Sequence, residues 1–141
     1  MHSELVRAKQ IMIDGGYTCV VCGDNYTLTS TDRGVKPLLC WLDENRSFDT
    51  AYISDKVIGK AAAMLYVLLK AKSVYTTVIS KPAKQVFDDY GIDCYYDTLV
   101  DAIRNRTNTG FCPMETAVRD ISDLTEALDA IKLTLKKLNS K

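Results

Sequence analysis

The stretch TAYISDKVIGKAAAMLYVLLKAKSVYTTVIS, residues 50–80, decides the fold. Residues 50–54 and 73–80 are predicted strands, and the second of them is rich in β-branched side chains. Between them, the apolar segment 55–71 predicts a long and largely buried helix. A strand, a crossover helix and another strand place the two strands parallel, with a right-handed connection. The centre of the chain therefore predicts a parallel β-sheet.

The segment that follows repeats this order. Residues 81–91 predict a helix that begins near Pro82 and ends near Gly91. Residues 92–98 predict a third parallel strand, and residues 99–106 a short helix.

Upstream, residues 3–14 show helical spacing and residues 17–30 predict a β-hairpin. A short apolar helix is predicted over 37–45, and a last helix begins near Ser122. The hairpin adds antiparallel strands to the sheet, and the helices cover both faces. We therefore expect one α/β domain over 1–141, a three-layer α/β/α sandwich with a mixed sheet of about five strands.

The composition excludes several classes of partner. The 141 residues carry a formal net charge of zero, so we expect neither nucleic acid nor a membrane surface as a partner. The N-terminus lacks the apolar segment of a secretion signal, and the longest apolar run is too short to span a bilayer. A cytoplasmic location is expected.

The sequence predicts no metal and no cofactor. Cys19 and Cys22 form a C-x-x-C pattern within a predicted strand, where residues three apart point to opposite faces. The two thiols therefore diverge, and His2 is the only histidine in the chain. Buried cysteines in a reducing compartment explain the pattern better than a zinc site does.

Sites in such sheets form beyond the carboxyl ends of the parallel strands, where the next helix starts. Gly59 and Lys60 lie near such a start, where free N–H groups and a lysine favour an anion. The alternative is that the small residues allow close packing while Lys60 points to water. If Asp55 caps the helix, Gly59 and Lys60 lie one turn inside it, which weakens an anion site.

Two further segments offer cations. Arg33 and Lys36 stand in a turn that leads into a helix, which suits a phosphate or a carboxylate; the alternative is an ordinary solvated turn. Arg106 is a candidate anion clamp just upstream of the segment FCPMETAV, residues 111–118.

That segment holds the candidate reactive groups. Pro113 favours the first helical position, which makes Cys112 the N-cap and lets the Glu115 carboxylate reach back to the N–H of Cys112. A helix N-terminus stabilises a thiolate, whereas a neighbouring carboxylate opposes it. Cys112 and Glu115 are an acid/base pair in one interpretation, and a helix cap with a buried thiol in the other.

The motifs RGVKPLL, DKVIGKAAAMLY and NR with CPMETAV together resemble a small bacterial and archaeal family of unknown function. The resemblance covers most of the chain and implies a cytidine deaminase-like fold. Zinc deaminases carry His-or-Cys-x-Glu at one helix start and Pro-Cys-x-x-Cys at the next. The corresponding residues here are Gly59 to Ala61 and 82–86, which lack every ligand and the glutamate, so the zinc site is degenerate. Members of that superfamily often form oligomers, which implies a homodimer.

These observations favour a domain that binds a small anionic metabolite, such as a nucleotide, and acts on it if the reactive groups reach the pocket. A noncatalytic binding or regulatory module is the alternative, and a protein that assembles through its last helix or a sheet edge is a third class. The candidate reactive groups are Cys112, Glu115 and Asp55, and the candidate ligand-binding residues are Gly59, Lys60, Arg33, Lys36 and Arg106.

Overall fold

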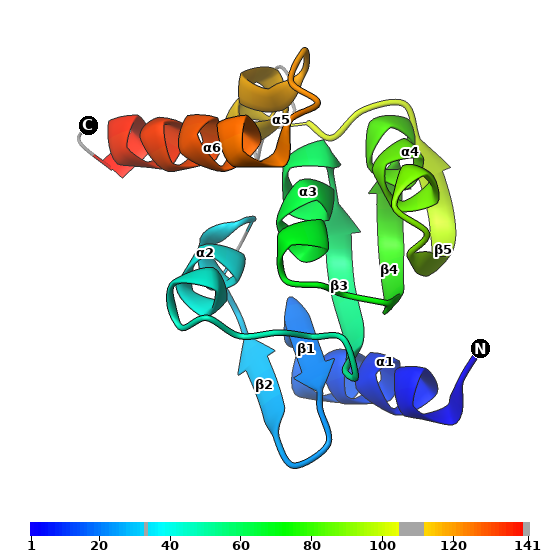
Figure 1. Ribbon diagram of the computed structural model, residues 1–141. Helices are drawn as coiled ribbons and strands as arrows, with labels where there is room; N and C mark the ends of the chain where they lie inside the picture. Colours follow the sequence, from blue (N-terminus) through cyan, green and yellow to red (C-terminus); the bar gives the residue numbers. More distant parts are fainter. Residues whose placement is uncertain (33, 105–111, 140–141) are drawn as a thin grey trace.

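The computed structural model describes residues 1–32, 34–104 and 112–139. Figure 1 shows one twisted sheet with helices on both of its faces. The order of its five strands is β2-β1-β3-β4-β5. The mixed α/β sheet predicted from the sequence is confirmed.

Antiparallel and parallel pairing meet at the middle of this sheet. β1 pairs antiparallel with both β2 and β3, and β3, β4 and β5 pair in parallel. The leading hairpin and the parallel crossovers are therefore as expected. The strands are β1 (Cys19–Cys22), β2 (Thr27–Ser30), β3 (Tyr52–Ile58), β4 (Ser73–Ser80) and β5 (Asp93–Val100).

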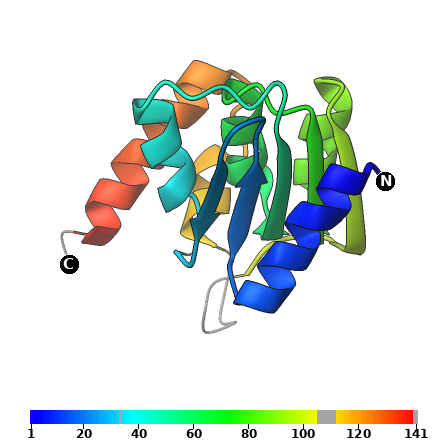
Figure 2. The same cartoon turned by 90° about the horizontal axis from the view of Figure 1, so that it is seen from below.

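The helices divide unequally between the two faces of the sheet. Among the described helices, α1 alone packs against β1, β3 and β4 on one face, whereas α2 to α6 lie on the other (Figure 2). No helix in the described part of the chain has the length and apolar character needed to cross a bilayer. The helices are α1 (Ser3–Gly15), α2 (Lys36–Asp43), α3 (Lys60–Leu68), α4 (Lys81–Asp89), α5 (Pro113–Val118) and α6 (Leu124–Asn139).

Two hydrophobic clusters result, one on each side of the sheet. The larger one surrounds α3 and includes the fully buried Tyr66 and Phe87. The smaller one lies beneath α1 and includes Leu5 and Met12. Cys19 belongs to the larger cluster and Cys22 to the smaller one, so the two thiols point to opposite faces as predicted.

Two strands are longer than the sequence suggests, and both changes correct a predicted helix. β3 continues to Ile58, so Asp55 lies within a strand and caps no helix. β5 continues to Val100, and residues 101–104 form no helix. In each case the eight-residue strand β4 supplies the pairing partners, because Ile79 pairs with Ile58 on one side and with Leu99 on the other.

Candidate functional site

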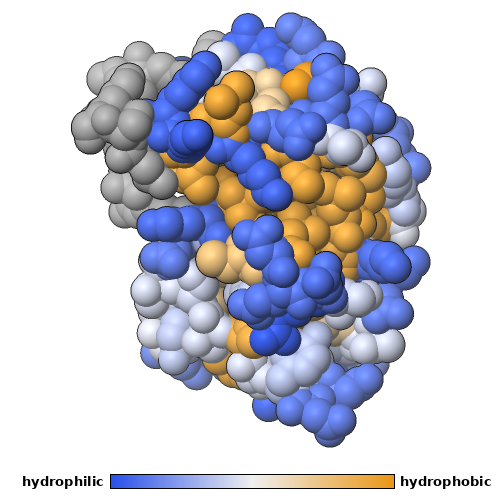
Figure 3. Space-filling model, turned by 60° about the vertical axis from the view of Figure 1, so that its left-hand side comes forward, coloured by the Kyte–Doolittle hydropathy of each residue, from blue (hydrophilic) through white to orange (hydrophobic). Residues whose placement is uncertain are grey.

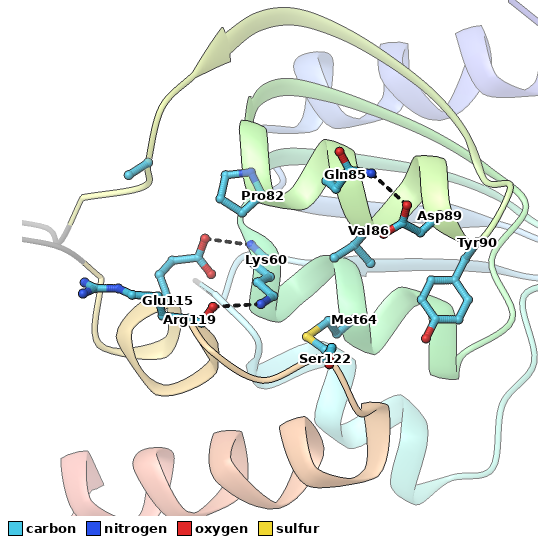
Figure 4. A pocket seen from close by; sticks show the side chains of 11 residues that line it. Lys60, Met64, Pro82, Gln85, Val86, Asp89, Tyr90, Glu115, Arg119 and Ser122 are labelled. Carbon is cyan, nitrogen blue, oxygen red and sulfur yellow. Dashed lines mark hydrogen bonds between the residues drawn. The ribbon is translucent and has the colours of Figure 1, made fainter.

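A groove of about 800 Å³ begins beyond the carboxyl ends of β3 and β4 and extends between α3, α4 and α5 as far as Tyr90 (Figure 4). One end of it lies at the helix starts where the sequence predicted a site. α3 contributes Lys60 and Met64; α4 and its C-cap contribute Pro82, Gln85, Val86, Asp89 and Tyr90; Ala102, Glu115, Arg119 and Ser122 complete the lining.

The start of α3 holds a carboxylate that belongs to the chain itself. The backbone N–H of Lys60 donates to Glu115 Oε1 at 2.7 Å, and the N–H of Ala61 donates to Glu115 Oε2 at 2.9 Å. The first N–H groups of a helix have no partner within the helix and carry partial positive charge. Glu115 therefore uses the N–H groups at the helix start where the sequence predicted an anion site.

Gly59 makes this contact possible. It is the N-cap of α3 with φ −98° and ψ 179°, an extended conformation that any residue adopts. A Cβ at this position would overlap both carboxylate oxygens of Glu115. The glycine is required for space and not for its backbone angles.

The Lys60 side chain crosses to α5. Its Nζ donates to the carbonyl oxygen of Arg119 at 3.0 Å, at the C-cap of α5 (Figure 4). A lysine is favourable there because the end of a helix presents unpaired carbonyl groups. Lys60 and Glu115 thus fasten the start of α3 to both ends of α5.

Cys112 is the N-cap of α5 and Pro113 its first residue, as expected. The predicted capping box is wrong, because the Glu115 carboxylate turns away from Cys112 toward α3. The N–H of Cys112 donates instead to Ile103 O at 3.1 Å. Cys112 is half-buried and does not line the groove.

Asp55 lies beneath α3, away from the groove. Its carboxylate accepts a hydrogen bond of 2.6 Å from the Tyr66 hydroxyl, which also lies 3.3 Å from Cys19 Sγ. Burial raises the pKa of Asp55 to about 7, although the Tyr66 hydroxyl and the N–H groups of Val57 and Lys56 counteract it. Burial likewise raises the pKa of Cys19.

The remaining predicted residues do not join this site. Lys36 begins α2 and is not part of the groove lining. Arg33 and Arg106 lie outside the described residues. Of the candidates, the structure brings together Gly59, Lys60 and Glu115.

Sequence reasoning missed the part of the lining that α4 provides. Gln85 Nε2 donates to Asp89 Oδ1 at 2.8 Å, and the Tyr90 ring is 49 % exposed beside them. Polar residues four apart are common on any solvated helix face, so this spacing carried no signal. Pro82 was interpreted only as a helix start, yet it also borders the groove.

Within the described residues, no cluster of three or more His, Cys, Asp or Glu side chains could hold a metal ion. The charged side chains that line the groove are the carboxylates of Glu115 and Asp89, the Lys60 ammonium and the Arg119 guanidinium. Glu115 is already bound to two N–H groups. The arrangement suits recognition of a polar ligand by hydrogen bonds and charge.

Comparison with known proteins agrees with this fold. A crystal structure of a DUF1893 family protein (TM1506) from Thermotoga maritima is similar to the chain with a TM-score of 0.81 and 26 % sequence identity. The similarity covers 97 % of this chain and 92 % of that one. No curated protein matches the chain. The model of the TM1506 domain of unknown function, DUF1893, matches residues 7–135, and the chain therefore belongs to the DUF1893 family.

Proposed function

We propose that this protein binds a small metabolite that carries a phosphate or carboxylate group, in the groove between α3, α4 and α5. One observation carries the proposal. The start of α3, which borders the groove, donates two short hydrogen bonds to the Glu115 carboxylate, and the side chain of Lys60 leaves from the same helix start. Because Glu115 already uses both N–H groups, the Lys60 ammonium is the group at this edge that would bind a ligand's anion.

The ligand's anionic group would bind to Lys60 Nζ. Its present partner is the neutral carbonyl of Arg119, at 3.0 Å. A hydrogen bond between an ammonium and an anion is roughly twice as strong as one to a neutral acceptor, so an anion competes well for this nitrogen. Glu115 can keep its two N–H bonds while Lys60 changes its partner.

The rest of the groove suits the body of such a ligand. A volume of about 800 Å³ lies within the range of small-molecule sites. Met64 and Val86 supply an apolar wall, and the exposed ring of Tyr90 can stack on a planar group. Gln85 and Asp89 offer hydrogen bonds near that ring. A nucleotide has this combination of an anion, a planar ring and polar edges.

Binding without turnover is the version that the geometry favours. Of the three candidate reactive groups, only Glu115 lines the groove, while Cys112 and Asp55 do not. One observation keeps a catalytic version as the second candidate. Zinc deaminases carry their glutamate at a helix start, and Glu115 brings a carboxylate to the start of α3 from a later segment.

The same placement supports a cytidine deaminase-like assignment of the fold. Residues 59–61 and 82–86, which correspond to the two ligand segments of the zinc enzymes, lie at the starts of adjacent helices on one groove. With the ligand residues replaced, the site would hold an organic anion instead of zinc. A cytoplasmic location remains our prediction.

A thermal-shift screen tests the binding role. Phosphate, acetate, nucleoside monophosphates and sugar phosphates would each be added to the wild type and to Lys60→Ala. The matched control is Lys36→Ala, since Lys36 is also the first residue of a helix but lies away from the groove. We expect ligands that raise the wild-type Tm to lose most of that effect in Lys60→Ala and to keep it in Lys36→Ala. Equal shifts in all three proteins would refute the role of Lys60.

A further inference from the structure

Strand β5 forms an exposed edge of the sheet. Figure 1 shows it at the border of the sheet, opposite the side where α2 and α6 lie. Its only strand neighbour in the described sheet is β4, so the N–H and C=O groups on its outer side have no ladder partner there. Tyr95, Tyr96 and Leu99 are 44 %, 37 % and 38 % exposed. Such an edge is a template for another strand.

The two edges of the sheet differ in how they are protected. β2, at the other edge, has four residues, and short edge strands recruit partners poorly. β5 has eight residues, DCYYDTLV, without the lysine, proline or glycine that usually blunts an edge. α1 packs on β1, β3 and β4, so within the described residues it does not shield β5.

We propose that a second copy of this chain pairs antiparallel with β5 across a twofold axis, which joins the two sheets into one. Such an interface uses the same surface on both copies, so the strand must be complementary to itself. A register centred on Tyr96 places Asp97 opposite Tyr95 and Asp93 opposite Leu99. A register centred on Asp97 would place two carboxylates face to face, which is destabilising. Of these two registers, the charges favour the one centred on Tyr96.

The charges of α4 fit the same axis. Lys81 and Lys84 lie in its first half and Asp88 lies in its second half. Lys81 forms an exposed ion pair with Asp101, and Lys84 forms one with Asp88. α4 packs against β5, so its charges lie close to the β5 edge. A twofold axis makes the two α4 helices antiparallel and sets the lysine half of each against the aspartate half of the other. Such complementarity favours this orientation over others.

Another surface competes with β5 as an interface. Figure 3 shows a continuous hydrophobic surface on the side of the molecule where α6 and α2 lie in Figure 1. Nothing in the structure indicates what would cover it, whereas β5 combines open backbone groups with a self-complementary charge pattern. A variant on α6 therefore serves as the control.

Sedimentation equilibrium and native mass spectrometry of the full chain test the proposal. We expect a species of twice the 15.7 kDa chain mass. Tyr96→Arg would set two guanidinium groups opposite each other at the axis and should weaken the dimer at least tenfold. Leu133→Arg is the matched control, since Leu133 is 54 % exposed on α6, and it should leave the dimer intact. A monomeric wild type, or a dimer lost in Leu133→Arg but kept in Tyr96→Arg, would overturn the proposal.

A cross-link reports on the register independently, even if Tyr96→Arg fails to fold. In the proposed register the two copies of residue 96 face each other with Cα atoms about 4.5–5.5 Å apart, within reach of a disulfide. Tyr96→Cys in a Cys40→Ser background, which removes the exposed native thiol, should form a disulfide-linked dimer under mild oxidation. Cys40→Ser alone should not. Absence of the link in the Tyr96→Cys protein would contradict the register.

Discussion

Gly59 and Glu115 should be energetically coupled, because each is needed for the same two hydrogen bonds. Glu115→Ala removes the carboxylate from the N–H groups of Lys60 and Ala61. Gly59→Ala leaves the carboxylate in the chain but places a methyl group where its oxygens lie. The two single variants should therefore lose the same contact by different routes.

The magnitude follows from the partners. Net hydrogen bonds to a charged group contribute about 1.5–3 kcal/mol, and water can replace part of this because both bonds are only partly buried. We expect Glu115→Ala to lower the free energy of unfolding by about 3 kcal/mol. Gly59→Ala should cost slightly less, about 2 kcal/mol, because an alanine at these ordinary backbone angles also restricts the unfolded chain.

The double variant distinguishes this explanation from a general intolerance of alanine at position 59. In the Glu115→Ala background the three atoms nearest to the added methyl group are gone, so Gly59→Ala should then be neutral or stabilising by about 0.5 kcal/mol. Urea denaturation followed by circular dichroism measures all four proteins, with the m-value checked for constancy. Glu126→Ala is the control, since Glu126 also lies in the first turn of a helix but is exposed. Equal costs of Gly59→Ala in both backgrounds would refute the coupling.

Two other side chains give predictions that are independent of the groove. The native pKa of Asp55 is about 7, above its usual value of 3.8, so the folded state holds the carboxyl proton more tightly than the unfolded state does. The free energy of unfolding therefore falls as the pH rises from 4 through 7, by roughly 4 kcal/mol in all. Asp55→Asn should flatten this decline in urea titrations at pH 5 and pH 8, and parallel curves for the two proteins would contradict the assignment. Ser80 is fully buried, and its Oγ accepts a hydrogen bond from the N–H of Ala83 at 3.2 Å. Ser80→Ala should therefore lower the free energy of unfolding by about 1 kcal/mol. An unchanged Tm would show that the cap contributes nothing.

The arrangement of the sheet was predictable because its signals are local. β4 is a run of β-branched residues between two helical patterns, and that order determines parallel neighbours. The ends of β3 and β5 were not predictable, because they depend on pairing. Asp55 is a good helix cap in isolation, yet here it lies opposite Thr76 of β4 and Cys19 of β1. Strand pairing on both sides of Asp55 therefore stabilises the strand more than a single cap would stabilise a helix.

The sequence indicated the two parts of the candidate site separately, but not that they lie together. The glycine and lysine at the start of α3 indicate an anion site, and the proline before Glu115 indicates a helix start. Their meeting was beyond sequence reasoning, because Glu115 and Lys60 are 55 residues apart and no periodicity links them. The capping box offered Glu115 a local partner, but the start of α3 offered two N–H groups and the more positive end of a longer helix.

The division of the core by the sheet makes the stability of this fold uneven. The cluster beneath α1 is small, whereas the cluster around α3 holds most of the buried side chains. A sub-global opening that releases α1 exposes Leu5 and Met12 and leaves the interior around Tyr66 and Phe87 closed. We therefore expect α1 to behave as a separate cooperative unit, or foldon. Because the groove lies on the other face, we expect it to keep its shape while that unit opens and closes.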